Sequence, residues 1–423
     1  MRVLALLLLC AFCNAKLILV SLDGFRHDYI EMAKKAGKRV EAFEEIAAAG
    51  FRAEVQNIFI TITFPTHLAM ATGRYVENHG LFDNDFYDPI FNETFSYKSA
   101  KNQMEDKWNN YNNNEPIWLT NQRHGNRSCV FNWPGSNQAY KGKYPFATNG
   151  LYTEAPTFEY RVDRMMDWIT QDDFSFCAFY FNEPDSTGHR FGPNSTEVLE
   201  KVQLVNDGIA YMLKKIKEHP KLKDNVDLIV TADHGMTYTP DTQLIKLYEH
   251  IPRNRYVGNV SPPIVGMWPV EGETVDSLYD ALIKANLQHI TVYKKHELPE
   301  MYHYAKSYRM PEIFIIADPG WMIKANADDF TKSFPYGMHG YNNSFHEMHP
   351  FMVAAGPGIK KMDGIQTFQQ IDLYPFVCGL MRLQRPNSHD GSIDRALKFM
   401  ANEPSKEFLE TFKLYATGIR TDF

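Results

Sequence analysis

Uninterrupted apolar runs that alternate with helix-type segments constrain the fold of this chain more than any other feature. Three of these runs are residues 17–22, 174–181 and 226–231. A strand that is apolar on both faces belongs in a sheet covered on both faces, which is typical of parallel sheets. Helical patterns separate the runs, at 40–49, 158–170 and 196–219. This order predicts an α/β fold with a mostly parallel sheet between helix layers.

Two irregular regions interrupt the alternation. Residues 85–150 are rich in Asn, Tyr, Asp and Trp, and residues 240–311 contain only one strand-like run and one amphipathic segment, at 263–268 and 274–286. Apolar strands at 312–317 and 351–355 and a helical pattern at 368–383 then return to the core. We interpret both irregular regions as insertions.

Composition permits one large domain. Of the 423 residues 44% are hydrophobic and 14% aromatic, so the chain can bury a sizeable core. The formal net charge is -7 and the basic residues form no long run. We therefore expect no groove for a nucleic-acid polymer, whereas a small anion could bind beside metal ions that invert the local charge.

The N-terminus has the pattern of a secretory signal. Residues 1–15 combine Arg2, an apolar run and the small residue Ala15 at the cleavage side. No later stretch reaches the about 18 to 20 apolar residues of a transmembrane helix. Five sequons agree with export: Asn92, Asn126, Asn194, Asn259 and Asn342. We expect a secreted, extracellular protein without a transmembrane anchor, in an oligomeric state that stays open.

Cysteines contribute little to the predicted fold. Without the signal the chain keeps Cys129, Cys177 and Cys378, an odd number that permits one internal disulfide at most. Cys177 lies inside the apolar run 174–181, and we predict a buried thiol there.

Acidic and histidine residues gather where the predicted strands end. Six of them are expected to meet at the carboxyl edge of the sheet, where open α/β sheets bind ligands: Asp23, Asp185, His189, Asp233, His234 and His339. Each motif alone also fits a turn or a helix cap, so the prediction depends on their coincidence. So many like charges need a cation, and mixed Asp and His ligands suit zinc better than manganese or iron.

Thr63 lies at a predicted strand-to-helix corner, before a helix-like run at 67–72 that Gly73 ends. Alone, it fits a helix N-cap. Beside two metal ions its hydroxyl could instead ionise near neutral pH and attack a phosphoryl group. A covalent phosphothreonine would form, and water would hydrolyse it. We expect Asn84 to donate to the developing charge.

Five other histidines are interpreted as structural or supporting residues: His27, His67, His79, His346 and His349.

The motifs occur in a characteristic order. They are Ser21-Leu-Asp-Gly-Phe25, Thr63-Phe-Pro65, Ala71-Thr-Gly73, Asn78-His-Gly80, Glu183-Pro-Asp-Ser-Thr-Gly-His189, Asp233-His-Gly-Met236 and His339-Gly-Tyr341. From residue 17 to about 392 the chain resembles the ectonucleotide pyrophosphatase/phosphodiesterase family of the alkaline phosphatase superfamily. Ile62 and Thr66 depart from the pattern, because many members have Lys and Asn there.

The resemblance implies an alkaline-phosphatase-like α/β/α sandwich with insertions, in a single catalytic domain over residues 16–423, and two zinc ions as cofactors. The family pattern assigns four residues to one zinc ion, Asp23, Thr63, Asp233 and His234. It assigns three to the other, Asp185, His189 and His339.

The resemblance also implies the reaction. A secreted phosphodiesterase or nucleotide pyrophosphatase would release a nucleoside 5′-monophosphate from a small nucleotide substrate. Phe64 and Tyr152 would hold the base between their rings. Two alternatives stay open, a choline-lipid phosphodiesterase of phospholipase C type and a non-catalytic secreted binding protein. A sulfatase is disfavoured, because Thr63 stands where such an enzyme carries a cysteine-derived nucleophile.

Overall fold

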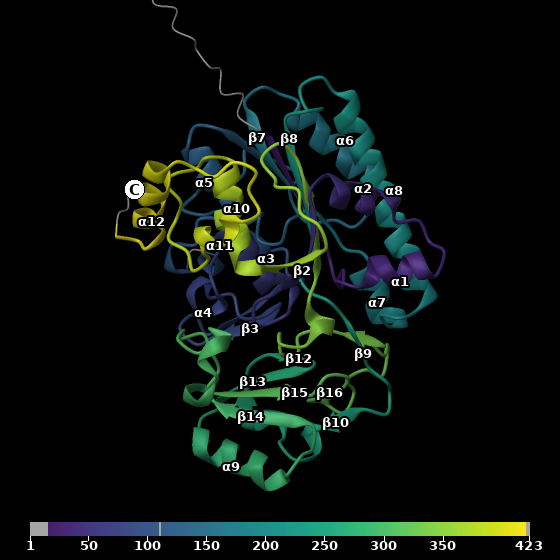
Figure 1. The fold of residues 1–423 in the computed structure, drawn as a ribbon. Coiled ribbons are helices and arrows are strands. Elements are labelled where there is room, and N and C mark those ends of the chain that lie inside the picture. Colours follow the sequence, from purple (N-terminus) through teal and green to yellow (C-terminus); the bar gives the residue numbers. More distant parts are fainter. Residues whose placement is uncertain (1–15, 110, 420–423) are drawn as a thin grey trace, which may run out of the picture.

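The computed structural model describes residues 16–109 and 111–419, so the predicted signal at 1–15 lies outside the described residues. A central sheet, which lies between helices in Figure 1, has the strand order β19-β2-β18-β8-β1-β7-β5-β6. All its pairings are parallel except those of β18 with β2 and β8. The strands are β1 Lys16–Leu22, β2 Phe51–Gln56, β5 Arg127–Phe131, β6 Ala147–Thr148, β7 Phe174–Phe181, β8 Val226–Thr231, β18 Phe351–Ala355 and β19 Ile365–Gln369.

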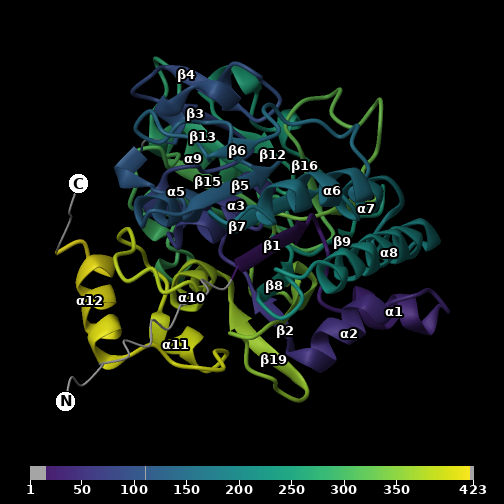
Figure 2. The same cartoon turned by 90° about the horizontal axis from the view of Figure 1, so that it is seen from above.

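Helices cover both faces of this sheet (Figures 1 and 2). Alternate residues of β1 enter different cores: Ile18 and Val20 join one hydrophobic cluster, and Leu17 and Leu19 the other. The first face is covered by α1 Tyr29–Lys35, α2 Glu41–Ala49, α6 Phe158–Ile169 and α8 Thr196–Glu218. The second is covered by α3 Thr63–Thr72, α5 Ile117–Arg123, α10 Leu373–Leu380, α11 Ile393–Leu397 and α12 Lys406–Ala416. The predicted α/β/α sandwich is confirmed.

The second irregular region forms a lobe below the sheet in Figure 1. Its own five-stranded sheet comprises β11 Tyr256–Val257, β12 Val260–Ser261, β13 Ile264–Pro269, β14 Ile290–Lys294 and β15 Ile313–Ala317, beside α9 Val275–Ala285. β15 pairs antiparallel with β13 and β14. The prediction that residues 312–317 return to the central core is therefore wrong, because a short apolar run does not reveal which sheet it joins.

Two other segments differ from the prediction. Only the first part of region 85–150 lies outside the central layers, with the hairpin β3 Asp85–Asp88 and β4 Glu93–Ser96, whereas α5, β5 and β6 extend them. The expected helix at 368–383 begins later, since Phe368 lies in β19 beside Val55 of β2. Within the described residues, no helix is long and apolar enough to cross a membrane.

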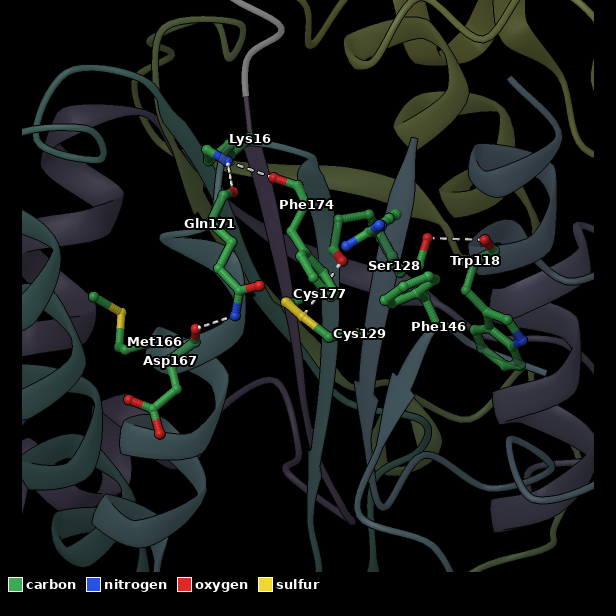
Figure 3. The surroundings of a disulfide bond; sticks show 12 residues. Lys16, Trp118, Ser128, Cys129, Phe146, Met166, Asp167, Gln171, Phe174 and Cys177 are labelled. Carbon is green, nitrogen blue, oxygen red and sulfur yellow. Dashed lines mark hydrogen bonds between the residues drawn. A yellow bond between two sulfur atoms is a disulfide. The ribbon is translucent and has the colours of Figure 1, made fainter. Parts of the chain in front are cut away.

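Cys129 and Cys177 form a disulfide between adjacent strands (Figure 3). They are register partners in the parallel strands β5 and β7, with Cα atoms 4.5 Å apart. Both side chains are buried, as predicted for Cys177, but the prediction of a free thiol there is wrong. The sequence did not reveal that β5 and β7 are neighbours. Cys378 is buried in α10 and, in the described part of the chain, has no disulfide partner.

Candidate active site

The six predicted acidic and histidine residues meet at the carboxyl ends of the central strands. Asp23 directly follows β1, Asp233 lies just beyond β8, and Asp185 begins the helix α7 Asp185–Phe191 after β7. Strand register aligns these ends, since Leu22 pairs with Phe181 and Ser21 pairs with Thr231. The parallel sheet therefore presents three carboxylates at one edge.

Three side chains converge on the Nε2 atom of His234. It lies 3.1 Å from Asp233 Oδ2, 3.4 Å from Asp23 Oδ1 and 3.3 Å from Thr63 Oγ1. The other ring nitrogen, Nδ1, lies 2.9 Å from the carbonyl oxygen of Gly235. Because a carbonyl only accepts, Nδ1 carries the proton and Nε2 presents its lone pair to the cluster.

A second group surrounds Asp185. Its Oδ1 atom lies 3.4 Å from His189 Nε2 and 3.7 Å from His339 Nε2. Nδ1 of His189 donates to the carbonyl oxygen of Gly337, and Nδ1 of His339 donates to that of Thr61, each at 2.8 Å. Such hydrogen bonds fix the tautomer of metal-binding histidines and leave Nε2 as the ligand atom.

Unpartnered carboxylate oxygens indicate that this donor set fits metal ions. Asp23 Oδ1, Asp185 Oδ1 and Asp233 Oδ2 are buried and have no hydrogen-bond partner among the described residues. Buried polar atoms without a partner are costly, and a cation would remove that cost. Two groups bring their ligand atoms within 4.8 Å of one another, Asp185 with His189 and His339, and Asp23 with Asp185 and His234.

The close approach of the three buried carboxyl groups also shifts their pKa values. Burial raises the pKa of Asp23, and the charges of Asp233 and Asp185 raise it further. Burial also raises the pKa of Asp185. Burial opposes ionisation of Asp233, but the adjacent His234 and His67 outweigh it and hold this pKa below its usual range. The protein alone does not stabilise all three carboxylates in the charged form.

Thr63 is the first residue of α3, and Ile62 is the N-cap in an extended conformation. The helix thus begins four residues earlier than the expected run at 67–72, and Thr63 is not its cap. Pro65 is the third helical residue, where its missing N–H leaves no hydrogen bond unmade. Gly73 ends the helix with φ 66°, as predicted.

Asn84 is fixed beside this helix start. Its Oδ1 accepts a hydrogen bond from the Phe64 N–H at 2.9 Å. The preceding residue, Asp83, is buried and accepts from Asn259 Nδ2 at 2.6 Å and from Ser261 Oγ at 2.9 Å. Because Oδ1 of Asn84 is occupied, its Nδ2 group is the donor that it can offer to a ligand.

A cavity of about 680 Å³ opens above the cluster. Thr63, Phe64, Asn84 and Tyr152 line it, together with Asp23, Asp185, His189 and His339. Asp233 and His234 are fully buried and do not line the cavity. Every predicted site residue therefore lies either in the lining of the cavity or in the side-chain cluster beneath it.

Two supporting residues lie beside the cluster; sequence reasoning missed Tyr180, whereas His67 was among the histidines predicted to be structural or supporting. Tyr180, near the end of β7, donates its hydroxyl hydrogen to Asp23 Oδ2. His67 lies one turn after Thr63; its Nε2 atom lies 2.8 Å from Ser21 Oγ, and its Nδ1 atom lies 2.8 Å from Thr63 O and 3.4 Å from Asp233 Oδ2. The i,i+4 spacing of Thr63 and His67 on a helix could have indicated that His67 contacts Thr63.

A family model and individual proteins similar to this chain indicate the same family. The family model for type I phosphodiesterase / nucleotide pyrophosphatase matches residues 17–342. Human ectonucleotide pyrophosphatase/phosphodiesterase family member 5 is 34% identical over 380 residues, 89% of this chain and 76% of that protein. Bis(5′-adenosyl)-triphosphatase enpp4 of Xenopus laevis is 34% identical over 396 residues, 92% of this chain and 82% of that protein.

A solved structure is also similar. It is murine member 5, an inactive threonine-to-alanine variant in complex with AMP, with a TM-score of 0.84 and 35% identity. The match covers 92% of this chain and 100% of the murine chain.

Proposed function

The chain belongs to the ectonucleotide pyrophosphatase/phosphodiesterase family of hydrolases, and from this premise we propose that it cleaves phosphodiester or pyrophosphate bonds of nucleotides with Thr63 as nucleophile. The observation that carries the proposal is the position of the Thr63 hydroxyl. It lies 3.3 Å from His234 Nε2, at the cavity and beside buried carboxylate oxygens that have no hydrogen-bond partner in residues 16–109 and 111–419.

Two zinc ions fit the donor set. Asp23, Thr63, Asp233 and His234 would hold one, and Asp185, His189 and His339 the other. When bound, the ions would supply Lewis-acid stabilisation of the phosphoryl oxygens and of the Thr63 alkoxide. The unpartnered oxygens of the three aspartates support this assignment.

In the first step Thr63 Oγ1 forms a bond to phosphorus. The hydroxyl loses its proton, the bond from phosphorus to the leaving oxygen breaks, and that oxygen takes up a proton. In the second step water attacks phosphorus, the bond to Oγ1 breaks, and the Thr63 hydroxyl and a nucleoside 5′-monophosphate are released. The Nδ2 group of Asn84, held by the Phe64 N–H, would donate to the phosphoryl oxygen.

The substrate class is proposed from the cavity and a relative. A volume of about 680 Å³ suits a small-molecule ligand. The similar murine protein is described in complex with AMP. Phe64 and Tyr152 both line the cavity, and we infer that they hold the nucleobase, since stacking contributes about 1–3 kcal/mol per base.

The disulfide and the ectonucleotidase relatives support an extracellular or luminal location, and we propose secretion. Asn92 and Asn194 are exposed and could carry glycans. Asn259 is buried and donates to Asp83, so this sequon is not available in the folded chain.

Paired activity assays test the function. Purified chain with measured zinc content is given a chromogenic thymidine phosphodiester and a choline phosphodiester at equal concentrations. The proposal expects clear preference for the thymidine substrate and release of thymidine 5′-monophosphate. Preference for the choline substrate would favour the lipid phosphodiesterase, and no turnover with zinc bound would favour the binding protein.

A further inference from the structure

A cluster of histidines and one glutamate lies outside the cavity described above. His27 follows β1 in the loop before α1, Glu54 lies in β2, and His346 lies in the short helix His346–Met348 before β18. One ligand atom from each lies within 4.8 Å of the others. Residues from three separate segments thus meet, and none of them lines the cavity.

Glu54 is the centre of the cluster. Its Oε1 atom lies 2.6 Å from Nδ1 of His346 and 2.6 Å from Nδ1 of His349. Nε2 of His349 lies 2.9 Å from the carbonyl oxygen of Asn343. Both nitrogens of His349 therefore face acceptor oxygens, so this ring orients the carboxylate and turns neither nitrogen towards an ion. The side chains of His27, Glu54 and His346 each keep an atom available to bind a metal ion.

His27 supplies a polar atom whose hydrogen bonding is unexplained. Its Nδ1 atom is buried and has no hydrogen-bond partner in the described part of the chain. Burial lowers the pKa of His27, which favours the neutral ring. Burial opposes ionisation of Glu54, but the hydrogen bond from His349 and the neighbouring histidines lower its pKa. A neutral imidazole and an ionised carboxylate are the forms that bind metals.

Hydrogen bonds to backbone carbonyl oxygens hold the three segments together. The His27 N–H donates to the carbonyl oxygen of His349 at 3.0 Å, and the Val55 N–H donates to that of Pro350 at 2.8 Å. Asn57 Nδ2 donates to the carbonyl oxygen of Met348 at 2.9 Å. The cluster is therefore preorganised. The His346 side chain is 76% exposed, so an ion can reach it from solvent.

We propose that His27, Glu54 and His346 form an additional zinc site, separate from the catalytic pair. Two imidazoles and one carboxylate suit zinc, with water as the fourth ligand. The cation takes the place of the proton shared by His346 Nδ1 and Glu54 Oε1, and that proton is released to solvent. The ion would connect β2 to the segment that precedes β18.

Zinc stoichiometry tests the site. The full chain and its variants are equilibrated with Zn²⁺ at a buffered free concentration that saturates the wild type, and bound zinc is counted per chain. Glu54→Gln and His346→Ala should each bind one ion fewer than the wild type. His289→Ala is the matched control, because His289 is an exposed histidine paired with Asp318 at 3.2 Å, and it should bind as many ions as the wild type.

Turnover of a nitrophenyl phosphodiester shows whether each variant is folded. His346→Ala should retain activity within about twofold, because the side chain does not contact the catalytic cluster. The added zinc equivalent should also raise the melting temperature of the wild type and of His289→Ala, but not of His346→Ala. Equal zinc counts in all four proteins would overturn the proposal. So would loss of several ions together with turnover in His346→Ala, because the cluster would then not be a separate site.

Discussion

The floor of the cavity is built mainly on the strand ends of the central sheet, whereas much of its wall comes from the irregular chain between residues 84 and 154. The floor includes Asp23, Thr63, Asp185 and His189, at strand ends and on the helices that follow, and His339, which follows the short strand β17 Gly337–Met338. Asp233 and His234 lie buried beneath it. The wall includes Tyr97, Trp133 and Tyr152. Strand ends are fixed by the hydrogen bonds of the sheet, while loop residues depend on local contacts.

This difference suggests that the floor and the wall bind different parts of the substrate. A rigid floor suits the phosphoryl group, which all substrates share. A wall of aromatic side chains suits the group that varies between substrates. Changes in the floor should therefore reduce turnover of every substrate, and changes in the wall should affect nucleotides alone.

Thr63→Ala should have the largest effect. We expect turnover of all diesters to fall by about 10³-fold or more, because no other hydroxyl occupies this position. Zinc content should change little, since the other ligands remain. Thr63→Ser, which keeps the hydroxyl, should retain part of the activity. Turnover is measured with bound zinc counted in parallel, and near-normal activity of the alanine variant would exclude the covalent mechanism.

Chelation should stop activity on all substrates and also lower the melting temperature. Without cations the buried carboxylates of Asp23, Asp185 and Asp233 face one another unneutralised. Zinc should restore both properties. Thermal unfolding and nitrophenyl diester hydrolysis are measured as chelator is added. Unchanged activity and melting temperature after prolonged chelation would show that the floor does not depend on metal ions.

Tyr180→Phe should weaken the floor without removing a ligand. The hydroxyl donates to Asp23 Oδ2, and loss of such a supporting hydrogen bond costs about 10–100-fold in metal affinity. Activity should recover at high free zinc. Turnover is measured across zinc-buffered solutions, and an unchanged zinc dependence would show that Tyr180 only fills space.

Tyr152→Ala tests the wall. We expect KM for nucleotide diesters to rise about tenfold, since a loss of about 1.4 kcal/mol is a factor of ten. Hydrolysis of a small nitrophenyl diester without a base should barely change. An equal loss of activity on both substrates would indicate structural damage. Unchanged activity on both would favour the choline-lipid substrate instead.

Asp83→Asn should have the smallest effect on turnover and act on stability. Burial raises the pKa of Asp83 to about 7, despite the hydrogen bonds from Asn259 and Ser261. Between about pH 4 and 7 the native state thus keeps a proton that the unfolded chain has lost, so this group makes stability fall as pH rises. Relative to the wild type, the variant should gain stability over that window. Urea unfolding at several pH values measures the difference, and a constant difference would contradict the raised pKa.

Local patterns in the sequence were sufficient for the central layers. The runs 174–181 and 226–231 form β7 and β8 with the predicted bounds, because strands buried on both faces leave an uninterrupted apolar signal. Residues a short distance after those strands, such as Asp185 and Asp233, could be placed at one edge because parallel strands end together. Their roles as metal ligands stay predictions.

Pairing between distant segments was decided by the tertiary structure alone. The apolar run of β15 fits either sheet, and only its register with β13 and β14 places it in the lobe. Cys129 meets Cys177 because β5 lies beside β7, and His27 meets Glu54 and His346 because three segments cross at one corner. Periodicity and motif spacing are local properties of the chain, whereas strand partners and side-chain clusters follow from the packing of the whole.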